Sequence, residues 1–106
     1  MVATPVGLSV IIAFFNPDDA PLGEVRQFCL ADGSLEAVWK TPLSPRATCP
    51  LLIEHDGVVK LIVTTAVENM PVEWQARLPN AGCLFVGDTP FDSLPESPRI
   101  QIETVT

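Results

Sequence analysis

Short apolar runs, each bounded by prolines, glycines or Asx residues, follow one another along this chain. Residues 10–15 are β-branched and aromatic, which predicts a buried strand. Residues 24–30 and 35–40 alternate between apolar and polar positions, and the Asp32-Gly33 turn signal lies between them. The sequence therefore predicts a hairpin here. Its second strand is expected to place Leu35, Ala37 and Trp39 on one face, opposite Glu36, Val38 and Lys40.

The second half of the chain continues the strand pattern. Residues 51–54 and 58–65 predict two strands joined by a His55-Asp56-Gly57 turn, and the latter should be the longest and central because both of its faces are apolar. Residues 83–86 predict a further strand, and residues 100–103 a terminal edge strand.

Two segments of the second half are expected to depart from the strand pattern. Residues 41–50 contain three prolines, so we expect no regular structure there. A helical turn is plausible only within residues 68–78, where Pro71 suits a first helical position.

Five or more short strands with almost no helix predict an all-β fold. A length of 106 residues suits one domain, residues 1–106, with one core. Two hairpin-like units of about forty residues lie in tandem, which is the period of propeller blades. The pattern thus favours about two blades of antiparallel strands, although periodicity alone leaves a small β-sandwich or barrel equally open.

Charge and composition narrow the partner classes. The formal net charge is −7 and the pI is about 4.4, so repulsion by phosphates argues against nucleic-acid binding. Residues 6–15 are apolar but too short to span a membrane, and they lack the features of a signal peptide. Cys29, Cys49 and Cys83 contain no C-x-x-C pair, and we interpret them as reduced, buried thiols of a cytoplasmic protein.

Several residues could carry chemistry, but for each we favour a structural role. His55 is the only histidine, and it lies beside a turn without a nucleophile motif. Two pairs of oxygen donors could ligate a metal, yet they lie where loops use such side chains to bond the backbone: Asp18 and Asp19, and Glu68 and Asn69. Asp88 and Asp92 are interpreted as turn formers. Trp39 and Trp74 are interpreted as core or interface aromatics.

Five stretches occur in an order typical of one enzyme family. Glu24-Val25-Arg26-Gln27-Phe28 and Asp32-Gly33-Ser34-Leu35 resemble its V-x-R-x-[DP]-x-G hairpin, and Ser44-Pro45-Arg46-Ala47-Thr48-Cys49-Pro50 resembles its R-P-T-C-like motif. Residues 61–66 resemble its L-Y-V-T-T-A strand, and Pro79-Asn80-Ala81-Gly82-Cys83-Leu84-Phe85 resembles its P-L-A-G-x-L-F turn. On these motifs the chain resembles the C-terminal portion of the SMP-30/gluconolactonase/luciferin-regenerating-enzyme (LRE-like) β-propeller family.

The resemblance implies a six-bladed propeller that hydrolyses lactones with a divalent cation, calcium, zinc or manganese, in its central channel. One ligand in that family is the aspartate of a P-D-G motif, and the nearest match here is Pro5-Val6-Gly7. Val6 replaces the aspartate, and an isopropyl group cannot coordinate a hard cation. We therefore expect no metal ligand and no catalytic residue in this chain. The substrate-binding residues are left unassigned.

Three functional hypotheses follow from these observations. The first is a truncated or degenerate relative of the lactonases, which keeps the scaffold of two blades but is inactive alone. The second is an active lactonase assembled as a homo-oligomer, since a two-blade unit has exposed strand edges and three copies would supply six blades. The third is a non-catalytic β interaction module of unrelated type. We favour the first.

Overall fold

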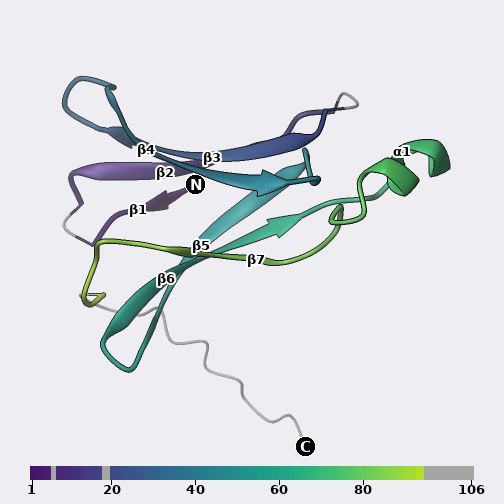
Figure 1. Cartoon of the computed structure of the whole chain (residues 1–106). Coiled ribbons are helices and arrows are strands. Elements are labelled where there is room, and N and C mark those ends of the chain that lie inside the picture. The colour runs from purple at the N-terminus through teal and green to yellow at the C-terminus, as the bar shows by residue number, and fades with distance from the viewer. Residues whose placement is uncertain (6, 18–19, 95–106) are drawn as a thin grey trace, which may run out of the picture.

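The computed structural model describes residues 1–5, 7–17 and 20–94, and almost all regular structure in this part is β (Figure 1). The first sheet has the strand order β1-β2-β3-β4, formed by Val2–Ala3, Ser9–Phe14, Leu22–Cys29 and Leu35–Pro42. The second has the order β5-β6-β7, formed by Ala47–His55, Val58–Thr65 and Phe85–Asp88. One short helix, α1, spans Val72–Arg77. The all-β prediction is confirmed.

Both sheets are antiparallel meanders in which each strand pairs with its neighbour in the sequence. Figure 1 shows them as two layers, with α1 beyond the ends of β6 and β7. The strands described here do not close into a barrel. Two stacked meanders are the arrangement expected of two neighbouring blades. An open two-layer sandwich has the same arrangement. Of the three architectures considered, the structure therefore excludes only the barrel.

The predicted hairpin is β3 and β4, and its turn contains Asp32, whose side chain accepts a hydrogen bond from the Ser34 backbone N–H (2.9 Å). Ala37 and Trp39 lie on one side of β4 and Val38 on the other, as predicted. Leu35 pairs with Phe28 on the side of Val38, so its predicted position beside Ala37 and Trp39 is wrong. The register shifts between Gln27 and Phe28. This bulge turns Glu36 toward Ser9, whose hydroxyl donates to its carboxylate, because an extra residue re-aims the side chain that follows it.

The prediction of an irregular segment over residues 41–50 is wrong at both ends. β4 continues through Pro42, and β5 begins at Ala47 and runs through Pro50. Proline is tolerated because β4 and β5 are edge strands. One side of each strand has no neighbouring strand, so an N–H that is missing on that side removes no hydrogen bond. A register shift between Ala47 and Cys49 relaxes the start of β5 further.

The remaining predictions fall close to the observed elements. β6 is the central strand of its sheet, as predicted, although β5 is one residue longer. β7 begins two residues later than the predicted strand over 83–86. Pro71 caps α1 from the position before its first residue. The edge strand predicted over residues 100–103 lies outside the described residues.

The core lies between the two sheets. Ile11 and Val25 of the first sheet are fully buried against the apolar side chains that the second sheet turns inward, which are Ala47, Leu52, Val59, Leu61 and Val63. Phe91 and Leu94, which follow β7, pack against the same cluster. The face that each sheet turns toward the other is called its inner face here, and the opposite one its outer face.

Candidate functional site

The connection between the sheets, Ser44-Pro45-Arg46, contains a buried arginine, and Ser44 Oγ and Arg46 Nε are buried without a hydrogen-bond partner. Arg46 is only 8% exposed. Its Nη1 donates to the Glu68 carbonyl (2.9 Å), its Nη2 to the Pro17 carbonyl (3.2 Å), and its guanidinium lies 5.5 Å from the centre of the Phe15 ring. Arg46 therefore ties the loops that follow β2 and β6 to the link between the two layers.

Gly23 lets this link approach the first sheet. A Cβ atom at Gly23 would overlap the Ser44 carbonyl oxygen and the Thr41 hydroxyl, so only glycine fits without a shift. The Thr41 hydroxyl donates to the same Ser44 carbonyl (2.7 Å). The stretch that resembles the R-P-T-C-like motif thus has a structural role, which sequence reasoning missed because it matched these residues only to a pattern.

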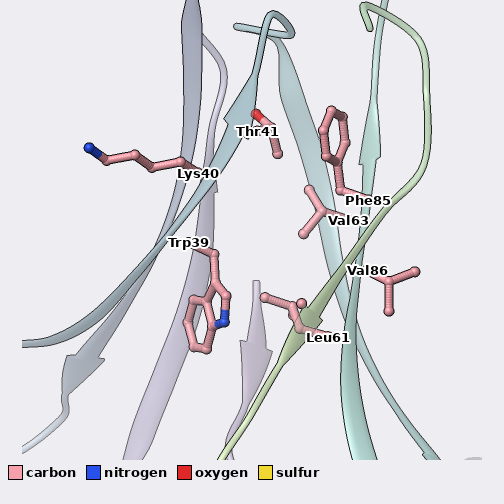
Figure 2. Close-up of a pocket in the computed structure, with 8 residues that line it drawn as sticks. Trp39, Lys40, Thr41, Leu61, Val63, Phe85 and Val86 are labelled. Atoms are coloured by element: carbon pink, nitrogen blue, oxygen red, sulfur yellow. The ribbon is translucent and has the colours of Figure 1, made fainter.

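A small cavity of about 90 Å³ lies where β4 meets β6 and β7. Figure 2 shows Trp39 of β4 and Leu61 of β6 pointing toward one another, while Lys40 points away from the cavity. Trp39 Nε1 donates to the Asp88 carbonyl (2.8 Å), and a Cβ at Gly87 would lie 2.8 Å from the indole Cδ1. Ligand pockets are typically about 300–1,000 Å³, so we interpret this cavity as a packing gap between sheet edges.

The predicted candidate residues within the described chain do not converge on one site. His55 is at the end of β5, and its Nε2 lies 3.2 Å from the carboxylate of Asp56, with both side chains more than 80% exposed. Glu68 contributes its backbone carbonyl to Arg46, and Asn69 has a left-handed backbone (φ 59°) in the same exposed loop. Asp92 is exposed in the segment after β7. These positions agree with loop and turn roles.

Three of the residues that bear on metal binding, Val6, Asp18 and Asp19, lie outside the described residues. Among the residues described, no three His, Cys, Asp or Glu side chains gather in a way that could hold an ion. The Val6 side chain offers no oxygen ligand. Within the part of the chain that the structure describes, the side chains do not form a divalent-cation site, and we derive no metal-dependent step.

The cysteines depart from expectation. Cys49 and Cys83 are exposed and Cys29 is half-buried, and all three are free thiols. The interpretation of three buried thiols is therefore wrong for Cys49 and Cys83, and Cys29 is only partly buried. Trp74, in α1, is half-buried like Trp39, which agrees with packing roles for both.

Two carboxylates have shifted pKa values, and both are on the surface. Hydrogen bonds from the side chain and backbone of Ser34 lower the pKa of Asp32 in the β3–β4 turn. The hydrogen bond and charge of Lys60 lower the pKa of Asp88. A raised carboxyl pKa in a cleft would suggest a general acid, and neither group behaves in that way.

The outer face of the second sheet contains an apolar row. Leu51, Ile62 and Val86 lie directly opposite one another across β5, β6 and β7, and Leu51 and Val86 are 50% and 67% exposed. The next row contains Ile53, followed by the ion pair of Lys60 and Asp88. The outward residues of β6 are therefore mixed: Val58 and Ile62 are apolar, and Lys60 and Thr64 are polar.

The outer face of the first sheet is similar. Ile12, Arg26 and Val38 form one row, and Val10 lies opposite Phe28 in the next. Phe14 and Phe28 meet edge to face with ring centres 6.2 Å apart, and the Arg26 guanidinium lies 5.0 Å from the Phe14 ring centre. Arg26 Nε donates to Glu24 (2.8 Å). The described part of the chain therefore presents apolar side chains on both sides of the stack.

Comparisons with known protein families, with curated proteins and with solved structures found no match to this chain. Within residues 1–5, 7–17 and 20–94, none of the helical structure has the length and apolar character needed to cross a bilayer.

Proposed function

We propose that this chain is a structural module of a larger β assembly: a truncated or degenerate relative of the gluconolactonase propellers that is inactive alone. The observation that carries the proposal is the sidedness of β6. Its inner residues are buried in the core, while Ile62 on its outer face belongs to an apolar row that water reaches. An exposed apolar row on the second face of a sheet gains stability when another layer removes it from water, which favours a covering partner.

The resemblance to the lactonases supports the same proposal from a different direction. Its motifs fall on the elements that a pair of blades would use: Arg46 and Thr48 at the link and the start of β5, Thr64 and Thr65 at the end of β6, and the Pro79–Phe85 turn before β7. Three threonine hydroxyls hold this end of the second sheet together. Thr48 and Thr64 share a hydrogen bond of 2.7 Å, and Thr65 donates to the Cys83 carbonyl (2.6 Å).

Inactivity of the isolated chain follows from the missing donor set. Hydrolysis of a lactone in the gluconolactonase manner needs a cation to polarise the carbonyl and to lower the pKa of water. Val6 cannot serve as the carboxylate ligand, and the candidate oxygen donors among the described residues are dispersed over turns and loops.

A hydrolysis assay tests this. The purified chain is incubated with gluconolactone and, in turn, with calcium, zinc and manganese, and acid release is followed against buffer containing the same ion. We expect no rate above buffer. A saturable, metal-dependent rate that is abolished by chelator would overturn the proposal and favour the alternative of an assembled active lactonase.

A further inference from the structure

We propose that the partner covering these faces is a second copy of this chain, docked head to tail: the outer face of the second sheet of one copy packs on the outer face of the first sheet of the next. This proposal deepens the proposed function and rests on it, because it names the layer that the module needs.

The apolar content of the two faces matches. The first sheet presents Val10, Ile12, Phe14, Phe28 and Val38 on its outer side, and the second presents Leu51, Ile53, Ile62 and Val86. Each set spans three neighbouring strands. The contact would repeat the packing already present inside one chain, where one face of the first sheet covers one face of the second.

Charge favours these two faces over the rest of the surface. The chain carries a net charge of −7, so two copies repel each other unless the surfaces that meet are close to neutral. The acids on the outer faces, Glu24 and Asp88, are paired with Arg26 and Lys60. The other described acids lie mainly in turns, loops and the helix, at Asp32, Asp56, Glu68, Glu73 and Asp92.

The two faces differ in their net charge. On the first, Arg26 and Lys40 outnumber Glu24 by one positive charge, whereas Lys60 and Asp88 balance on the second. Two copies of the first face would therefore repel each other. Covering both faces of every copy by symmetric contacts would bring first faces together, so the charges favour head-to-tail docking. In a head-to-tail contact both faces of every copy can be covered once a ring closes.

Three variants with the same substitution test the proposal: Val86→Lys on the second face, Val38→Lys on the first, and Val72→Lys as the control. Val72 lies on α1 and is 77% exposed, close to the 67% of Val86. Each change adds a positive charge to an acidic chain, so repulsion between copies does not increase. Circular dichroism and a melting curve confirm that each variant is folded.

Light scattering after size exclusion gives the mass. We expect the wild type and Val72→Lys to exceed the 11.4 kDa of one chain, and Val86→Lys and Val38→Lys to fall to that mass. Each monomeric variant keeps one intact face, so an equimolar mixture of the two should form a 1:1 dimer through the intact pair.

The outcomes separate this proposal from the proposed function. A monomeric wild type would overturn the proposal that the partner is a second copy. The proposal of an inactive module would still be tested by the lactonase assay. Loss of mass in Val86→Lys alone indicates a symmetric contact and overturns head-to-tail docking, as does a mixture that stays monomeric. Metal-dependent hydrolysis by an assembled wild type would overturn the proposed inactivity but would leave the docking proposal intact.

Discussion

Apolar side chains on the two faces of β6 have opposite surroundings. Val59, Leu61 and Val63 point inward and are at most 2% exposed. Ile62 points outward into a row whose flanking members, Leu51 and Val86, are at least half exposed. Composition alone therefore does not decide what a side chain contributes to the stability of the isolated chain. The contribution depends on whether a second layer covers it, because the gain comes from apolar area removed from water.

The largest expected difference between the faces comes from truncating them. Leu61→Ala should destabilise the chain by about 2–5 kcal/mol, because it leaves a cavity in the core. Val86→Ala should cost less than about 0.5 kcal/mol in the monomer, since the side chain is exposed. Urea unfolding of both variants, at a chain concentration low enough that each sediments as a single chain, measures the contrast. Equal losses would show that the outer face is already covered within the chain.

The next largest loss of stability is expected at Gly23, where the backbone approaches the Ser44 carbonyl closely. Gly23→Ala places a methyl group against the Ser44 carbonyl, which is backbone and cannot rotate away. We expect a loss of about 1–3 kcal/mol from overpacking, measured as a lower urea midpoint. Gly33→Ala is the matched control for the glycine change, as space around it is open. That control carries its own strain, because Gly33 has φ 73°. A Gly23→Ala loss no greater than that of the control would contradict the close contact.

A smaller effect is expected at the edge where the sheets meet. Trp39→Phe keeps an aromatic ring beside Gly87 but removes the donor to the Asp88 carbonyl. One net hydrogen bond contributes about 0.5–1.5 kcal/mol. Trp74→Phe in α1 controls for the change of ring size. Thermal melts of the two variants should show the larger decrease in Tm for Trp39→Phe, and the reverse order would reject the contact between β4 and β7.

The smallest effect concerns the outer ion pair. Lys60 lowers the pKa of Asp88 below its ordinary value of 3.8 in the folded chain. A lowered folded pKa contributes stability above the unfolded pKa, and that contribution is lost as the pH falls through the folded value. Asp88→Asn should therefore reduce the dependence of Tm on pH between about pH 5 and 2. The pair is exposed, so the change is small, and it should shrink further in high salt.

The sequence predicts those parts of the structure that depend on interactions between residues close together in the chain. The hairpin of β3 and β4 follows from alternation and the Asp32-Gly33 turn, which are local signals. The extent of β5 does not, because Pro50 is acceptable only on an edge strand and strand order is a property of the whole sheet. Cys49 and Cys83 show the same limit, since residue type alone suggested burial, whereas one lies on the edge strand β5 and the other before β7, and both are exposed.

The candidate surface was foreseeable only in part. The apolar character of both faces of residues 58–65 is visible in the sequence and predicted a central strand. The row of Leu51, Ile62 and Val86 required the register of three strands, which the sequence does not fix. The role of Arg46 was missed because its partners are the backbone carbonyls of Pro17 and Glu68, which leave no mark in residue type.

The central claim is that the outer faces are built to be covered. Sedimentation velocity of the wild type over a hundredfold range of concentration, beside Val86→Lys, tests it most directly. We predict that the wild-type mass rises above 11.4 kDa with concentration while the variant stays at that mass throughout. A wild type that sediments as one chain over the whole range, with both faces in water, would contradict the claim for this chain on its own.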